Sequence, residues 1–302
     1  MKMGMIGIGD IASKAYLPIL ATRQDIELSI TSRNQTAVHQ AAQQYRIKQA
    51  YTSVSDLIAS GIEAAFVHTA TKSHPEIVKQ LVSAGVHVFV DKPIAYTLSE
   101  AEQVVSYAKQ RDVKLMVGFN RRFAPMYRDV KQHIKEPETI FLQKNRTGPL
   151  SDLRTTLFDD FIHVVDTLVY FAGEPIEVSV KAKLEQQKAH YVVLNLHKGS
   201  TTAIGMMNRN TGVTDERLEM TGNQRKLVVH NMVNTISFEH NQEHHHKFED
   251  WTTTLYRRGF VDMIDHFIEH VKQGTACESS GEAALTAHEI CERMTQELVA
   301  RL

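Results

Sequence analysis

The stretch Gly7-Ile8-Gly9-Asp10-Ile11-Ala12 follows a short apolar run that opens the chain. It has the G-x-G-x-x-A form of the dinucleotide fingerprint. The first glycine permits a tight turn, the second lets the backbone approach a pyrophosphate, and a small third residue lets helix and strand pack closely. Amide groups at the start of the following helix would face the phosphates. We therefore expect a dinucleotide to be bound by Gly7, Gly9, Asp10, Ile11 and Ala12; the alternative is an ordinary tight turn.

Strand and helix patterns alternate through the first third of the chain. The expected strands are residues 2–8, 26–31, 64–68, 86–90 and 114–117; the expected helices are 11–22, 35–45, 74–84 and 99–111, the last with Ser99 as its N-cap. Strands that alternate with helices of this length predict βαβ units and a parallel sheet with helices on both faces.

The pattern changes after Gly118. A helix over 158–171 precedes segments of period 2 at 176–184, 191–197, 201–207, 218–222 and 226–229, and helices follow at 260–271 and 282–302. Consecutive strands with short connections predict a mainly antiparallel sheet. We expect an α/β protein with a Rossmann NAD(P)-binding domain over residues 1–120. A second domain with an open, mainly antiparallel sheet would occupy residues 121–302 and supply the substrate-binding pocket.

The charge balance excludes some classes of partner. The 302 residues carry 34 basic and 35 acidic side chains, so nothing favours a nucleic acid or an anionic membrane. The first residues lack the apolar core and cleavage site of a signal peptide, and no apolar run could span a bilayer. The two cysteines, Cys277 and Cys291, form no CxxC pattern. We expect a cytoplasmic protein without a disulfide framework, without a metal site and without a membrane or nucleic-acid partner.

The end of the second expected strand bears on the choice of cofactor. An NAD site usually has an acid there to hold the ribose 2′-hydroxyl, whereas this strand ends Ile30-Thr31-Ser32-Arg33-Asn34. A serine hydroxyl and a guanidinium suit a 2′-phosphate, because arginine can bind it through two charge-assisted hydrogen bonds. The sequence favours NADP over NAD, with Ser32 and Arg33 as ligands; otherwise Arg33 is a solvated turn residue.

A specific resemblance begins at Asp91-Lys92-Pro93, at the carboxyl end of a buried strand. Further motifs follow at residues 70–74, at Gly118-Phe119-Asn120-Arg121-Arg122-Phe123, and at residues 159–163 with Asp166. Together with the fingerprint they resemble the glucose-fructose oxidoreductase / inositol dehydrogenase / MocA (Gfo/Idh/MocA) family, and within it the MviM-like predicted dehydrogenases. The resemblance covers nearly the whole chain. It is specific for fold and cofactor type and not for substrate.

The resemblance implies that Lys92, Asp159 and His163 face the nicotinamide and the substrate carbinol. On a helix, Asp159 and His163 share a face with Asp166, so a carboxylate could orient the imidazole. His163 would take the hydroxyl proton while Lys92 polarises the oxygen, although either could carry the proton. The alternative is a purely structural helix pair. The resemblance also implies cofactor contacts from Thr69, Thr71, His74, Asp91, Lys92, Pro93, Asn120 and Arg121.

One departure concerns the Asp-x-Gly-x-His pattern of many members. Phe161 replaces the glycine, which indicates a reshaped pocket, and Asp160 is a second candidate for the functional acid. Tyr127 could approach the substrate, and Arg121 or Arg122 could reach the cofactor or an anionic substrate group, or form surface salt bridges. The histidines at 244–246 are interpreted as part of an exposed polar loop and not as metal ligands.

We therefore expect hydride transfer between NADP(H) or NAD(H) and a hydroxyl or ketone of a sugar, polyol or related small molecule, by a homo-oligomer (a dimer or tetramer). Two other functions stay open. One is a non-catalytic nicotinamide-binding sensor, against which the acid–base set argues. The other is a lyase or glycosidase that holds NAD tightly.

Overall fold

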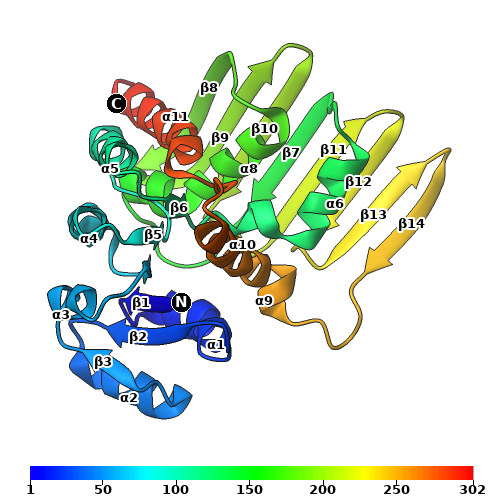
Figure 1. Cartoon of the computed structure of the whole chain (residues 1–302). Coiled ribbons are helices and arrows are strands. Elements are labelled where there is room, and N and C mark those ends of the chain that lie inside the picture. Colours follow the sequence, from blue (N-terminus) through cyan, green and yellow to red (C-terminus); the bar gives the residue numbers. More distant parts are fainter. Residues whose placement is uncertain (302) are drawn as a thin grey trace. The chain divides into compact units, whose positions relative to one another are not determined.

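The computed structural model describes residues 1–301, and these form two units (Figure 1). The first unit contains Met1–Gly118 together with Met263–Leu285, and the second contains Phe119–Asp262 and the residues from Thr286 onward. This division differs from the single boundary after residue 120 that the sequence indicated, because a late segment of the chain packs with the N-terminal part. The predicted fold class is confirmed in both units.

The first unit is built on a six-stranded parallel sheet with the order β3-β2-β1-β4-β5-β6. Its strands are β1 (Lys2–Ile6), β2 (Glu27–Thr31), β3 (Gln49–Tyr51), β4 (Ala64–Val67), β5 (His87–Val90) and β6 (Leu115–Val117). Its helices are α1 (Leu17–Leu20), α2 (Gln35–Tyr45), α3 (Val54–Ala59), α4 (His74–Ser83) and α5 (Leu98–Gln110), with a π-helical turn at Ala12–Tyr16. This is the strand order of a dinucleotide-binding Rossmann fold.

The late segment completes the core of the first unit. Helix α10 (Phe260–Gln273) brings Phe267 edge-on to Phe66 of β4 and Phe89 of β5, with ring centroids 5.2 and 5.6 Å apart. All three rings are fully buried. Further along, the Ser279 hydroxyl donates to the Val117 carbonyl at 2.9 Å, and the Val117 amide donates to the Ser279 carbonyl at 2.8 Å. The segment therefore covers apolar surface and also pairs with the edge strand β6.

One local expectation in the first unit is corrected, and two elements are found in addition. Helix α5 begins at Leu98, and its N-cap is Thr97 and not Ser99, because the Thr97 hydroxyl accepts from the Glu100 amide at 3.3 Å. Strand β3 and helix α3 were not expected. β3 is three residues long with no buried position, so it has no hydrophobic period to detect.

The second unit is built on an eight-stranded sheet with the order β14-β13-β12-β11-β7-β10-β9-β8. Its strands are β7 (Thr139–Lys144), β8 (Glu177–Glu185), β9 (Lys188–Lys198), β10 (Thr201–Asn208), β11 (Glu216–Gly222), β12 (Arg225–His230), β13 (Asn234–Glu239) and β14 (Gln242–Lys247). Neighbours are antiparallel except β7 and β10, which are parallel. Its helices are α6 (Pro125–His133), α7 (Leu153–Thr155), α8 (Ile162–Ala172), α9 (Thr254–Arg257) and α11 (Gly281–Val299), the last of which begins in the first unit.

Helix α8 lies directly over this sheet (Figure 1). A Cβ atom at Gly205 of β10 would come within 2.5 Å of Val164 and 2.8 Å of Leu168, so only glycine allows the helix to approach this closely. The expected single helix over 158–171 is instead a π-helical turn, Thr156–Phe161, followed by α8. The wider π turn changes the angular spacing of side chains before Ile162.

The interpretation of the three histidines as part of a loop is wrong. Residues 244–246 belong to β14, which pairs with β13 at the edge of the sheet and is exposed throughout. Its sequence is entirely polar, so it has no alternation between a buried and a solvated face. Within residues 1–301, no group of histidine, cysteine and acidic side chains could hold a metal ion. None of the helices in this range is long and apolar enough to cross a membrane.

Candidate active site

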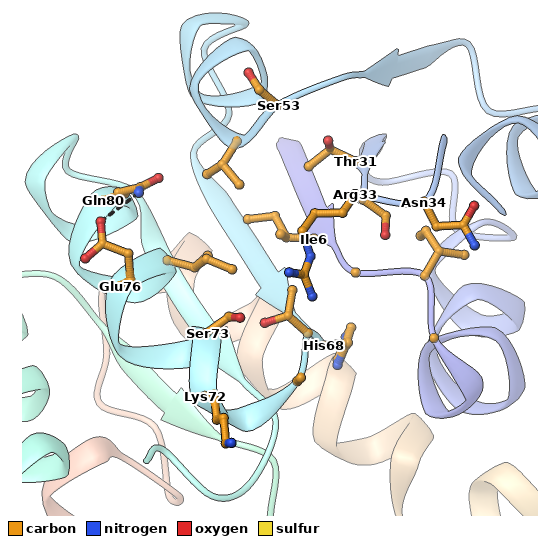
Figure 2. Close-up of a pocket in the computed structure, with 18 of the residues that line it drawn as sticks. Ile6, Thr31, Arg33, Asn34, Ser53, His68, Lys72, Ser73, Glu76 and Gln80 are labelled. Carbon is orange, nitrogen blue, oxygen red and sulfur yellow. Dashed lines mark hydrogen bonds between the residues drawn. The ribbon is translucent and has the colours of Figure 1, made fainter. Parts of the chain in front are cut away.

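A cavity of about 640 Å³ lies at the carboxyl ends of β1, β2 and β4, where open parallel sheets bind their ligands (Figure 2). Its volume is within the range of roughly 300–1,000 Å³ that is usual for small-molecule sites. Five of the residues predicted to bind the cofactor line it: Gly7, Gly9, Ser32, Arg33 and Thr69. All the lining residues belong to the first unit.

The two fingerprint positions require glycine for different structural reasons. Gly7 has a φ of +96°, and a Cβ there would lie 2.8 Å from the carbonyl carbon of His68 and 2.9 Å from the Thr69 amide nitrogen. Gly7 therefore allows β1 to turn against the loop after β4. A Cβ at Gly9 would meet no atom within 4 Å, so this glycine leaves space beside the cavity. The geometry fits a turn that lies against a dinucleotide pyrophosphate.

Arg33 extends its guanidinium into the cavity (Figure 2). Across residues 1–301 its side chain forms no ion pair or hydrogen bond, so the charge is available to a ligand. The next residue, Asn34, caps α2 by accepting from the Ala37 amide at 3.1 Å. This cap fixes the backbone from which Ser32 and Arg33 project.

The remaining fingerprint residues do not line the cavity. Asp10 is exposed and pairs with Lys14 at 2.7 Å, and Ile11 is 40% exposed. Ala12 is fully buried at the start of the π-helical turn, where its small size allows close packing. Their direct contact with a cofactor remains a prediction.

His74 links two loops of the first unit. Its ring is buried, with Nδ1 2.8 Å from the Pro93 carbonyl oxygen and Nε2 3.0 Å from the Thr69 carbonyl oxygen. Burial lowers the pKa of His74. Thr71 begins a short 3-10 turn, Thr71–Ser73, which directly precedes His74 in the sequence. His74 thus holds the loop after β4 against the loop that carries Lys92.

Asp91, Lys92 and Pro93 follow β5 directly, as expected. The Asp91 carboxylate accepts from the Lys92 amide at 2.8 Å, and its other oxygen lies 3.8 Å from Nδ1 of His68. Burial pushes the pKa of Asp91 upward, but His68 and Lys92 outweigh it and the pKa stays below its ordinary value. The His68 ring lies against the Tyr16 ring, with centroids 3.8 Å apart and the ring planes tilted by 36°. The Asp91 side chain is therefore an ionised anchor next to Lys92.

Asp159 and His163 belong to the second unit. Asp159 lies in the π-helical turn and His163 in the first turn of α8, where its ring meets Phe119 edge-on at 6.4 Å. Both residues are partly exposed. Phe161, the departure from the family pattern, is fully buried and belongs to the core of this unit.

Asp160 binds three cations: Lys144, Arg146 at 3.2 Å and Arg209 at 3.0 Å. Asp160 therefore organises the neighbouring positive charges, and its role as the functional acid stays a prediction.

Asn120 and Arg121 also belong to the second unit. Arg121 is buried and binds Glu216 through two hydrogen bonds of 2.8 and 2.5 Å, and the hydroxyl of the buried Tyr127 donates to the same carboxylate at 2.7 Å. The Asn120 side-chain amide donates to the Arg258 carbonyl at 2.8 Å. Of the two alternatives for Arg121 and Arg122, surface salt bridges do not apply, because both arginines are buried. The predicted cofactor contacts of Asn120 and Arg121 stay predictions.

The structure thus gathers part of the predicted set in one cavity. Lys92 lies in the first unit and Asp159 and His163 in the second, so their joint placement at one site stays a prediction. His68, Glu76 and Gln80 also line the cavity and were not predicted from the sequence. Lys144 and Arg146 were not predicted either, although they come shortly after the apolar run Ile140-Phe141-Leu142.

Comparison with known proteins gives the class. Residues 1–119 match the model of an oxidoreductase family with an NAD-binding Rossmann fold, and residues 125–241 match that of a YceM-like C-terminal domain. The chain is 33% identical to a protein of Salmonella typhimurium named as oxidoreductase YceM, over 99% of both chains. It is 25% identical to a myo-inositol 2-dehydrogenase of Thermotoga maritima, over 93% of this chain and 91% of the relative.

Solved structures agree. A dehydrogenase (MviM) from Clostridium difficile superposes with a TM-score of 0.95 at 32% identity, covering 98% of this chain and 99% of the other. A Gfo/Idh/MocA family oxidoreductase from Vibrio cholerae gives 0.93 at 29% identity, over 100% and 99%. The chain belongs to the Gfo/Idh/MocA family of oxidoreductases, which confirms the resemblance. It is an NAD(P)-dependent dehydrogenase.

Proposed function

We propose that this dehydrogenase transfers a hydride between NADP(H) and a hydroxyl or ketone group of a sugar, polyol or related small molecule. The observation that carries the proposal is the cavity of the first unit, with its fingerprint turn, the Arg33 guanidinium that has no partner among residues 1–301, and the Asp91-Lys92-Pro93 loop of the same sheet edge. Relatives named as myo-inositol 2-dehydrogenase and D-xylose 1-dehydrogenase (NADP(+)) support the substrate class.

The preference for NADP rests on Ser32 and Arg33. No acid occupies the end of β2, where an NAD site holds the ribose 2′-hydroxyl, and Arg33 points into the cavity (Figure 2). A 2′-phosphate would supply the negative charge that Arg33 lacks within the protein.

In the proposed reaction the nicotinamide supplies or accepts the hydride at the carbon that bears the reacting oxygen. Lys92 is a cation beside the ionised Asp91 and would polarise that oxygen. His163, oriented by Asp159, would exchange the hydroxyl proton. The reverse assignment, with Lys92 as the proton carrier, is distinguished by the pH profile of a Lys92→Arg variant, because arginine keeps the charge and does not release a proton at neutral pH.

The test is fluorescence titration of the purified protein with NADPH and NADH, followed by a sugar and polyol panel monitored by nicotinamide absorbance. We expect tighter binding of NADPH. Lys92→Ala and His163→Ala should each lower turnover by roughly 10²–10⁴-fold while the cofactor still binds. Lys109→Ala on α5 and His133→Ala on α6 are matched controls with exposed side chains, and they should leave turnover unchanged.

Three outcomes would contradict the proposal. Failure to bind either cofactor would remove its basis. Binding without turnover across the panel would indicate a regulatory dinucleotide-binding protein. A cofactor that co-purifies, does not exchange and supports a redox-neutral cleavage would indicate a lyase or glycosidase.

A further inference from the structure

The second unit has a pocket of its own at the end of β7 and the start of β11. We call it the basic pocket and define it by four cationic and two acidic side chains that line it: Arg121, Lys144, Arg146, Arg258, Asp215 and Glu216. None of the lining residues belongs to the first unit, so the pocket is distinct from the dinucleotide cavity.

The positive charges of the basic pocket exceed the negative ones. Glu216 neutralises Arg121 through their two hydrogen bonds of 2.8 and 2.5 Å. Lys144 and Arg146 depend on Asp160, which also binds Arg209, so one carboxylate serves three cations. Asp215 accepts from the Asn145 amide at 2.8 Å and takes part in no ion pair among the described residues.

Arg258 differs from the other cations of the pocket. Its side chain forms no ion pair with any residue between 1 and 301, although it lines the pocket together with Arg121 and Arg146. Its backbone is held in place, because its carbonyl accepts from Asn120 at 2.8 Å. The next residue is fixed as well, since a Cβ at Gly259 would lie 2.4 Å from the Asn120 carbonyl oxygen. An exposed guanidinium on a fixed backbone is a prepared ligand for an anion.

The pKa shifts agree with an unbalanced positive charge. Burial lowers the pKa of Lys144 to about 7, although Asp160 opposes this, and Arg121 and Arg146 lower it further. Desolvation lowers the pKa of Arg258, and so do Arg121 and Arg146, although Glu216 opposes them. An anion in the pocket would relieve the repulsion among these side chains.

The basic pocket is also connected to the proposed chemistry. Asp160, which binds Lys144 and Arg146, is the sequence neighbour of Asp159 and lies one turn before His163. A ligand group that sits among these cations would therefore lie beside the helix turn that carries the proposed proton exchange.

We propose that the basic pocket binds the anionic group, a carboxylate or a phosphate, of an acidic sugar or polyol on which this dehydrogenase acts. The proposal rests on the proposed function for the identity of the reaction. The anion site itself rests only on the second unit. Arginine binds the oxygens of a carboxylate and of a phosphate in the same bidentate manner. The feature that the two groups share is therefore their negatively charged oxygens.

The first experiment measures binding without turnover. Sulfate is titrated calorimetrically into the full chain, because its charge does not change between pH 6 and 9. We expect Arg258→Gln to weaken the site of the second unit at least about tenfold, since one charge-assisted contact is lost. Arg225→Gln removes the same charge from an exposed pair with Glu239 on the same sheet and should have no effect. Lys92→Ala should bind sulfate as the unmodified protein does.

The second experiment compares glucose, glucuronate and glucose 6-phosphate in the presence of NADP⁺. The charged sugar that is the better substrate identifies the group as carboxylate or phosphate, and Arg258→Gln should raise its KM about tenfold or more with kcat nearly unchanged. The KM for glucose should not change.

The outcomes separate the two proposals. Equal sulfate binding by Arg258→Gln and the unmodified chain would overturn the anion site. Equal KM values for neutral and charged sugars, with normal turnover, would overturn the substrate assignment and leave the dehydrogenase intact. Loss of sulfate binding in Arg258→Gln without turnover on any sugar would leave the anion site intact and overturn the reaction.

Discussion

The guanidinium of Arg122 holds the carboxylate of Asp166 with Nε 3.1 Å from both oxygens and Nη2 2.6 Å from Oδ1. The two side chains are 8% and 1% exposed. The pair joins the 3-10 turn Asn120–Phe123 to α8, the helix that carries His163. Removing one member would leave the other charge buried without its partner, which is costly.

Asp166→Asn should therefore lower the free energy of unfolding by about 3–5 kcal/mol, measured by urea denaturation. Asp129→Asn on α6, where the carboxylate is half exposed, should change it by less than about 0.5 kcal/mol. Equal stability of the two variants would show that the pair does not hold α8 in place.

Gly7 and Gly9 should respond differently to alanine. In Gly7→Ala the alanine would have to adopt a positive φ, and its Cβ would clash with the backbone of His68. We therefore expect the free energy of unfolding to fall by about 1–3 kcal/mol and cofactor binding to weaken. In Gly9→Ala the added Cβ would have no atom of residues 1–301 within 4 Å, so the stability should not change. The methyl group would, however, occupy the space left for the pyrophosphate and weaken cofactor binding. Thermal unfolding and NADPH titration measure the two effects. A destabilised Gly9→Ala would contradict this account.

Arg33→Gln should separate the two cofactors. Losing a charge-assisted contact of about 1.5–3 kcal/mol corresponds to NADPH binding that is roughly 10–100-fold weaker, while NADH affinity should change less than about twofold. Arg46→Gln, just after α2, removes the same charge at an exposed position. It should affect neither affinity. A parallel loss for both cofactors in Arg33→Gln would remove the argument for a 2′-phosphate.

Sulfate binding in the basic pocket should depend on pH through Lys144. Its pKa of about 7 means that it is charged below pH 7 and loses its proton as the pH rises. Affinity should therefore fall between about pH 6 and 8.5. The other charged groups around Lys144 are Arg121, Arg146, Asp160 and Glu216. The pKa of Arg121 is raised and that of Glu216 is lowered, so neither of these two changes its charge over this range. Lys144→Met should bind weakly and independently of pH, and a pH-independent affinity in the unmodified chain would contradict the assignment.

The two cysteines should be inert in the folded protein. Both thiols are free, and burial raises the pKa of Cys277 to about 11 and that of Cys291 further. Because the thiolate is the reactive form, a thiol reagent at about pH 8 should modify neither residue in the native state and both in urea. Rapid labelling of the native protein would show that one of the thiols opens to solvent.

The first unit could be predicted well because each of its main signals is local. Gly7 and Gly9 mark a turn whose demands are confined to a few residues, and α2 was located at the residues where it occurs. The role of His74 could not be read from sequence. Its partners are the carbonyls of Thr69 and Pro93, and which loop a backbone carbonyl meets depends on the tertiary fold.

In the second unit the alternating strands were found where one face is buried, as in β9 and β10. The basic pocket was missed for a physical reason. Arg121 and Glu216 lie 95 residues apart, and Glu216 comes to lie opposite Lys144 only because β11 pairs with β7. Charged side chains at strand ends resemble ordinary solvated residues until that register is known. The buried pair of Arg122 was likewise not predicted, because its partner Asp166 lies on a later helix.

The late return of the chain to the first unit, through Phe267 and Ser279, has a consequence for synthesis on the ribosome. When residues 1–118 have emerged, the Phe66 and Phe89 rings and the edge of β6 still lack their partners. They gain them only after the whole eight-stranded sheet has been translated. The nascent dinucleotide-binding part therefore stays incompletely packed until the residues after 263 have been translated. For the same reason, an isolated fragment that ends at Gly118 should expose apolar surface, and it should recruit chaperones or aggregate.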